Sequence, residues 1–165
     1  MSLYPDAVLI LAEDLVEICI KAGLRLALAE SCTGGLVAGC VTAVPGASAV
    51  LDRGFVTYAN EAKIEMLGVE RTILEANGAV SKPVALAMAD GALARSKAHI
   101  SLSITGIAGP GGGSGEKPVG LVHMASARDG RGTVHERHVF TGDRDSVRMQ
   151  AVQSGLRLLL RQALL

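Results

Sequence analysis

The stretch LALAESCTGGLVAG, Leu26–Gly39, decides how this sequence folds. An apolar run ends abruptly at Glu30, and Ser-Cys-Thr-Gly-Gly follows before small apolar residues resume. This order predicts a short buried strand, a tight turn and then a helix of small residues. The turn either only caps that helix or presents a group that does chemistry.

Outward from this stretch, apolar periodicity separates amphipathic helices from short strands. Helices are expected over residues 4–21, 32–44, 60–68, 81–98 and 143–165, and strands over residues 24–30, 53–59, 99–105, 119–127 and 133–140. Ser81 is expected to cap its helix. The alternation of strands and helices favours an α/β sandwich with a mixed sheet, in which the last two strands form an antiparallel hairpin.

Composition restricts the classes of protein that fit. The 165 residues suit one domain over 1–165, and 49% hydrophobic residues can form a sizeable core. Because 16 basic residues balance 16 acidic ones, no nucleic acid or membrane partner is expected. The odd number of cysteines and the absence of a signal peptide or long apolar segment predict a cytoplasmic protein.

Three loops follow the predicted strands at their carboxyl ends, where α/β sheets usually bind ligands. They are 30–35, 58–63 and 105–113. None of the four histidines lies in these loops, and no metal-ligand spacing is present, so neither a catalytic histidine nor a metal has local support. No cofactor is predicted.

Ser31 lies in the first loop, at the expected start of a helix. Free N–H groups there could receive an anion or an oxyanion, and Gly34 and Gly35 would let a substrate approach the backbone, so Thr33 and Gly34 are substrate-binding candidates. Ser31 could equally be a plain helix cap. Lys63 is a possible base if burial lowers its pKa, and otherwise an ordinary exposed lysine. The Tyr58 hydroxyl could orient either partner.

The other candidates suit a phosphate. Backbone N–H groups of the Gly-rich loop, Gly109 and Gly111 among them, can hold an anion, although no nucleotide-binding glycine motif fits its register. Arg144 and Arg148 lie four residues apart near the start of the last helix. They could bind a phosphate or only balance neighbouring aspartates. Cys32 is a rival nucleophile, but adjacent side chains in a turn point in different directions.

Several motifs in order resemble the C-terminal domain of the competence/damage-inducible CinA family. They are AESCTGGLVA, VPGAS, YANEAK, LGV, GAVS, TGIAGPGG, KPVGLV and FTGDRDSVR, which together cover nearly the whole chain. Members that consist of this domain alone act as nicotinamide-nucleotide amidohydrolases. No molybdopterin-binding-like domain precedes the motifs, which favours a stand-alone enzyme.

The resemblance implies a three-layer α/β/α fold, a homodimer and a metal-free serine amidohydrolase acting on the carboxamide of nicotinamide mononucleotide. Ser31 matches the nucleophile, Lys63 the base and Tyr58 a supporting position, while Thr105 and Gly106 match residues that line the pocket. Ala59 replaces a serine found in many relatives. Two alternatives stay open: a non-catalytic nucleotide- or phosphate-binding regulatory module, and a Ser/Lys amidase for another small carboxamide.

Overall fold

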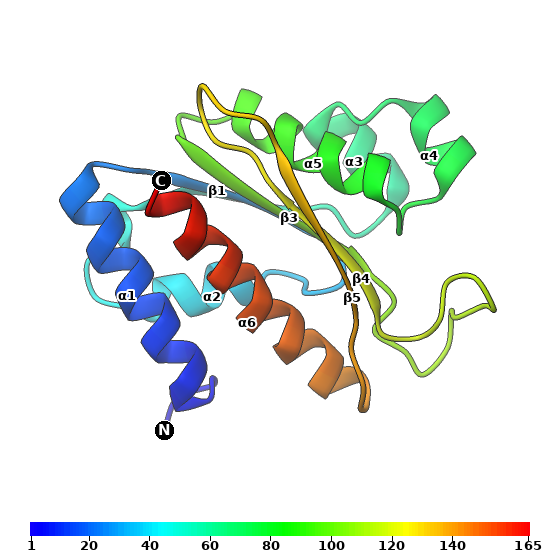
Figure 1. Ribbon diagram of the computed structural model, residues 1–165, viewed down its shortest axis with the longest axis horizontal. Coiled ribbons are helices and arrows are strands. Elements are labelled where there is room, and N and C mark those ends of the chain that lie inside the picture. Colours follow the sequence, from blue (N-terminus) through cyan, green and yellow to red (C-terminus); the bar gives the residue numbers. More distant parts are fainter.

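The computed structural model describes residues 1–165 and places the Leu26–Glu30 strand, β1, next to the edge of a five-stranded sheet (Figure 1). The strand order is β2-β1-β3-β4-β5. Strand β1 runs parallel to both neighbours, and the fourth strand runs antiparallel to the third and to the fifth. The other strands are β2 (Leu51–Val56), β3 (Ile100–Gly106), β4 (Leu121–Ser126) and β5 (Val134–Val139). The expected mixed sheet and closing hairpin are therefore confirmed.

Helices cover both faces of the sheet, which makes the fold a three-layer α/β/α sandwich (Figure 1). One layer holds α1 (Asp6–Ala22), α2 (Leu36–Thr42) and α6 (Arg144–Ala163). The other holds α3 (Asn60–Leu67), α4 (Arg71–Asn77) and α5 (Lys82–Ala94). A short 3₁₀ helix, Ala47–Ala49, precedes β2.

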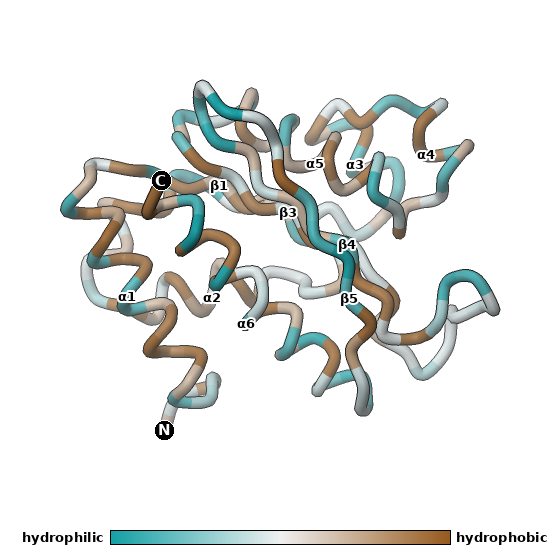
Figure 2. The backbone as a smooth tube through the Cα atoms, in the orientation of Figure 1, coloured by the Kyte–Doolittle hydropathy of each residue, from teal (hydrophilic) through white to brown (hydrophobic).

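Strand β1 alternates its side chains between two separate hydrophobic cores. Leu26 and Leu28 pack with helices α1, α2 and α6, whereas Ala27 and Ala29 pack with the opposite layer. All positions of the strand are buried, as expected for a parallel strand covered on both faces. Figure 2 shows the corresponding hydropathy: β1 is largely hydrophobic, while α6 alternates along its length as an amphipathic helix does.

Hydroxyl groups attach strand β3 to helix α5 and to the loop before it. Ser101 and Ser103 donate to the carbonyls of Ala89 and Ala85, at 2.7 Å and 2.6 Å between oxygens. Thr105 donates to the Ala79 carbonyl at 2.9 Å. These buried polar side chains are thus paired, and the small residues of α5 allow the helix to lie close to the sheet.

Three local expectations differ from the structure. Helix α2 begins at Leu36, not near Thr33, because Gly34 and Gly35 have φ of 57° and 100°, which a right-handed helix cannot contain. The short helix α4 was not expected. Ser81 occupies the cap position of α5, but its hydroxyl donates back to the Gly78 carbonyl and does not cap the helix. No helix has the length and apolar character needed to cross a membrane.

The close approach of α3 and α5 depends on Gly91. A Cβ atom there would overlap the carbonyl oxygen of Leu67, the last residue of α3. We therefore expect Gly91→Ala to lower the free energy of unfolding by about 1–3 kcal/mol. Chemical denaturation measures this, with Gly132→Ala as the control, because nothing lies within 4 Å of a Cβ at Gly132. Equal stabilities of the two variants would contradict the prediction.

Candidate active site

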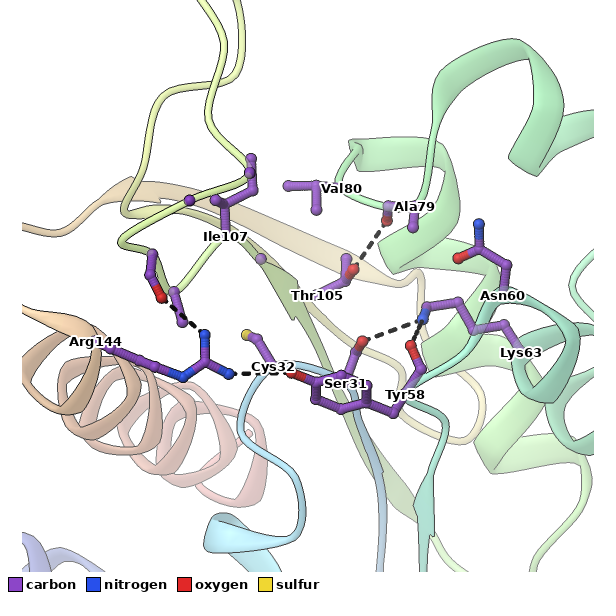
Figure 3. A pocket seen from close by; sticks show the side chains of 15 residues that line it. Ser31, Cys32, Tyr58, Asn60, Lys63, Ala79, Val80, Thr105, Ile107 and Arg144 are labelled. Atoms are coloured by element: carbon purple, nitrogen blue, oxygen red, sulfur yellow. Dashed lines mark hydrogen bonds between the residues drawn. The ribbon is translucent and has the colours of Figure 1, made fainter.

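A cavity of about 290 Å³ opens at the carboxyl ends of β1 and β3, where the three candidate loops meet (Figure 3). The parallel pairing of β1 with β2 and with β3 brings these loops to one edge of the sheet. The lining residues are Ser31, Cys32, Tyr58, Asn60, Lys63, Ala79, Val80, Thr105, Gly106, Ile107, Ala108, Gly109, Gly111, Gly112 and Arg144.

Ser31 and Lys63 contact each other in this cavity. Ser31 directly follows β1, and Lys63 lies in the first turn of α3. The Lys63 Nζ atom is 3.1 Å from Ser31 Oγ (Figure 3). A hydroxyl that lies within hydrogen-bond distance of an amine is the arrangement that an activated serine nucleophile requires.

The Lys63 side chain is buried, with only 1% of its surface exposed, and it makes no ion pair. Burial disfavours the charged ammonium form and lowers the pKa of Lys63 below its ordinary value of 10.5. The alternative of an exposed lysine on a helix face is therefore wrong. The reason is that Lys63 points inward from α3, toward the end of β1.

The remaining contacts of Lys63 are with backbone carbonyl oxygens. Its Nζ lies 2.8 Å from the Thr57 carbonyl oxygen and 3.4 Å from that of Tyr58. A neutral amine has two N–H donors and one lone pair. When Lys63 is neutral, donation to these two carbonyls leaves its lone pair for the Ser31 hydroxyl, whereas the ammonium form donates to all three oxygens. In the neutral state Lys63 can accept the proton of Ser31.

Arg144 lies across the open side of the cavity. Its guanidinium donates to the Gly109 carbonyl at 2.8 Å and to the Tyr58 hydroxyl at 3.1 Å (Figure 3). It thereby joins the start of α6, the Gly-rich loop and the loop after β2. The Tyr58 side chain is 60% exposed, and its hydroxyl contacts Arg144, not Ser31 or Lys63.

The cavity brings together most of the residues singled out from the sequence, but three lie outside its lining: Thr33, Gly34 and Arg148. Arg148 donates to the carbonyl oxygens of Cys32 and Thr33, at 3.0 Å and 3.4 Å, and so holds the turn from the side of α6. These contacts link Arg148 to the backbone of the turn that carries Ser31.

The sequence did not reveal the apolar wall of the cavity. Ala79, Val80 and Ile107 lie across the cavity from Ser31 (Figure 3), and Ala108 also lines it. They belong to two connecting segments, where small apolar residues have no periodicity that would distinguish a pocket from a core. Asn60, also missed, lines the cavity beside Lys63.

The expected role of the α2 N-terminus is wrong. Its N–H groups are not free, because the Glu30 carboxylate accepts hydrogen bonds from Gly35, Val37 and Ala38. An anion or oxyanion cannot use the same donors. A lone acidic residue at the end of an otherwise apolar strand was the sequence signal for this contact.

Cys32 lies beside Ser31 but is not an activated nucleophile. It is buried, at 6% exposure, and desolvation raises the pKa of its thiol to about 11. The thiolate is the reactive form of cysteine. At neutral pH Cys32 therefore contributes a small, uncharged surface to the cavity.

Comparison with known proteins assigns the family. A model described as the CinA C-terminal domain matches residues 9–163. The chain belongs to this family. Members of known structure share the fold: a competence/damage-inducible protein from Agrobacterium tumefaciens superposes with a TM-score of 0.96 at 48% identity, covering 98% of both chains. A CinA superfamily protein from Escherichia coli gives 0.90 at 36% identity, covering 100% of this chain and 95% of that one.

Curated CinA relatives differ in length. A CinA-like protein of Anaeromyxobacter dehalogenans is 56% identical over 147 residues, which is 88% of this chain but 36% of the relative. The chain thus spans about a third of such relatives. A nicotinamide-nucleotide amidohydrolase of Escherichia coli K12 is 48% identical over 160 residues, 96% of this chain and 97% of the relative.

The three cysteine thiols of this CinA-domain chain are expected to be unreactive in the native protein. Cys19, Cys32 and Cys40 are free, and burial raises the pKa of each to about 11. At pH 8 only about one thiol in a thousand is then a thiolate. We expect iodoacetamide to leave all three unmodified in the native protein and to alkylate all three in denaturant, as measured by mass spectrometry. Rapid native alkylation of Cys32 would contradict this.

Proposed function

We propose that this protein is a nicotinamide-nucleotide amidohydrolase, which converts nicotinamide mononucleotide to nicotinate mononucleotide and ammonia. One observation carries the proposal: the buried Lys63 amine lies 3.1 Å from the Ser31 hydroxyl, inside a cavity. The near full-length similarity to the Escherichia coli amidohydrolase supports the choice of substrate.

The first half of the reaction forms an acyl-enzyme. Neutral Lys63 takes the proton of Ser31, whose Oγ attacks the carboxamide carbon and produces a tetrahedral oxyanion. The Lys63 ammonium then gives this proton to the leaving nitrogen. The C–N bond breaks, ammonia departs, and the nicotinoyl group remains as an ester on Ser31.

The second half releases the acid. A water molecule enters the position vacated by ammonia, and Lys63 accepts its proton as the oxygen attacks the ester carbon. The C–O bond to Ser31 breaks, and Lys63 returns a proton to Ser31 Oγ. Lys63 is neutral again at the end of the cycle, and the proposed steps use only Ser31, Lys63, the substrate and water.

The cavity offers a place for each part of the substrate. Val80 and Ile107 give an apolar surface against which the pyridine ring can stack, and Thr105 and Gly106 also line the cavity. We assign the 5′-phosphate to Arg144 and to backbone N–H groups of Gly109 and its neighbours in the same loop. Arg148, which holds the turn, is not expected to contact the phosphate.

Lys63 also distinguishes this proposal from its rivals. A module that only bound phosphate would gain nothing from a buried amine against a serine, because burial of an ionisable group costs free energy. A Ser/Lys amidase for another small carboxamide would use the same two residues, and substrate assays must separate it. We further propose that the protein is cytoplasmic, which is consistent with its three free thiols. We also propose that it forms a homodimer.

The activity assay measures ammonia released from nicotinamide mononucleotide. We expect Lys63→Met to lower kcat by about 10²–10⁴-fold, the usual contribution of a general base. Ser31→Ala should lower kcat by at least the same factor, because the Cys32 thiol should not replace Ser31 as the nucleophile. The matched control is Lys97→Met, an exposed lysine in the connection that follows α5, which should keep native turnover. Native-like turnover by folded Ser31→Ala would refute the mechanism.

The pH dependence of kcat/KM reports on Lys63. The base works only when neutral, so activity should rise with pH as Lys63 loses its proton. Because burial lowers the pKa of Lys63, the midpoint of this rise should lie clearly below 10.5. Steady-state rates across the stable pH range measure it, with circular dichroism as the folding control. A midpoint at or above 10.5 would mean that the amine is not the base.

A further inference from the structure

Glu30 is a buried acidic residue that the mechanism above does not use. It is the last residue of β1, is 2% exposed and makes no ion pair. A buried carboxylate without partners would be very unfavourable, so its contacts indicate what it does. It directly precedes Ser31 in the sequence.

The partners of Glu30 are backbone N–H groups at the start of α2. Gly35 and Val37 donate to Oε2, each at 3.1 Å, and Ala38 donates to Oε1 at 2.9 Å. The carboxylate therefore reaches over the turn that carries Ser31 and binds the element that follows it. The beginning and the end of the turn are thus held together by one side chain.

The backbone of the turn is fixed at further points. The Ser31 N–H donates to the Ile104 carbonyl on β3 at 2.9 Å, and the Gly34 N–H donates to the Ser31 carbonyl at 3.0 Å. On the other side, Arg148 donates to the carbonyls of Cys32 and Thr33. Each of these bonds restricts how the peptide planes next to Ser31 can rotate.

Two N–H groups of the turn, those of Cys32 and Thr33, donate to no oxygen of the chain, whereas the N–H groups of Ser31 and of residues 34–38 are all bonded. Cys32 lines the cavity beside Ser31, whereas Thr33 is fully buried and does not. The Cys32 N–H belongs to the peptide that joins Ser31 to Cys32. A trans peptide directs its N–H opposite to its carbonyl, and Gly34 binds that carbonyl.

We propose, resting on the amidohydrolase chemistry above, that Glu30 is a positioning residue for the nucleophile turn. Its carboxylate occupies the N–H groups at the start of α2 and fixes the turn, so that the Cys32 N–H is the backbone donor left beside Ser31 to receive the oxyanion. Glu30 touches neither substrate nor Ser31 Oγ. It acts through the orientation of the Ser31–Cys32 peptide, which is effective only when held rigidly.

The test compares Glu30→Gln with the native protein. Glutamine has nearly the same size, but one carboxylate oxygen becomes an NH₂ group, which cannot accept from the backbone. We expect kcat for nicotinamide mononucleotide to fall about 10- to 100-fold while KM changes less than about 3-fold. A merely structural role would lower stability and the amount of folded enzyme but would leave kcat per folded molecule unchanged.

A second readout does not depend on the natural substrate. A small fluorophosphonate reacts with an activated serine: Ser31 Oγ would bond to phosphorus, fluoride would leave, Lys63 would take the proton, and the phosphoryl oxygen would occupy the oxyanion position. We expect the rate of Ser31 labelling, followed by mass spectrometry, to slow in Glu30→Gln by a factor similar to the loss in kcat.

Val41→Ala is the matched control, because Val41 is fully buried in α2 and lies outside the cavity. It should lower the melting temperature and keep the native labelling rate within about 2-fold. If Glu30→Gln does not fold, Glu30→Asp keeps the charge on a shorter side chain and should give an intermediate loss. The melting temperature of each variant is recorded alongside its rate.

Native labelling rates in Glu30→Gln, or in Glu30→Asp if only that variant folds, would overturn the proposal. An equal loss of labelling rate in Val41→Ala would also overturn the proposal, because disturbed packing of α2 would then be enough to explain the effect of Glu30→Gln. Failure of the proposed function gives a different pattern, in which native Ser31 is labelled rapidly but no ammonia is released from nicotinamide mononucleotide. A native Ser31 that does not react with the probe would count against both.

Discussion

The burial of one amine determines how this site can work. Lys63 has no carboxylate partner, and its Nζ is surrounded by two carbonyl oxygens and the Ser31 hydroxyl. Burial lowers the pKa of Lys63 and so makes its neutral form, which can accept a proton, more accessible. This amine is kept out of water and next to the serine by three features of the fold. They are the packing of α3 against α5, the direction of β1 and the path of the loop after β2.

The alternation of β1 separates two roles at its carboxyl end. Successive residues point to opposite faces of the sheet, so Glu30 turns toward α2 while Ser31 turns toward α3 and Lys63. A helix N-terminus next to a serine suggests an oxyanion site, but here an internal carboxylate occupies it. In the proposed mechanism these two neighbouring residues have different roles: Glu30 holds the turn, and Ser31 is the nucleophile.

Much of this architecture was predictable because it is encoded locally. The apolar run before Glu30, the glycines after Thr33 and the periodicity of the last helix predict a mixed α/β fold, and the order of the strands brings three loops to one edge. The residues Ser31, Lys63 and Thr105 were identified as candidates on this basis and on family resemblance. That identification was possible because ligand sites in α/β sheets usually lie at the carboxyl ends of the strands, where these polar residues are found.

The sequence by itself determined all five strands and most of the helices, the family and the candidate nucleophile. Only the tertiary structure decided that Lys63 is buried, that Arg148 holds the turn outside the cavity, and that Glu30 takes the helix donors. The physical reason is that these features depend on contacts between residues distant in sequence. Lys63 contacts Ser31 across a separation of 32 residues, and Arg148 contacts Cys32 across a separation of 116 residues. Local periodicity cannot specify such distances, and burial, which sets the protonation state of the amine, follows from them.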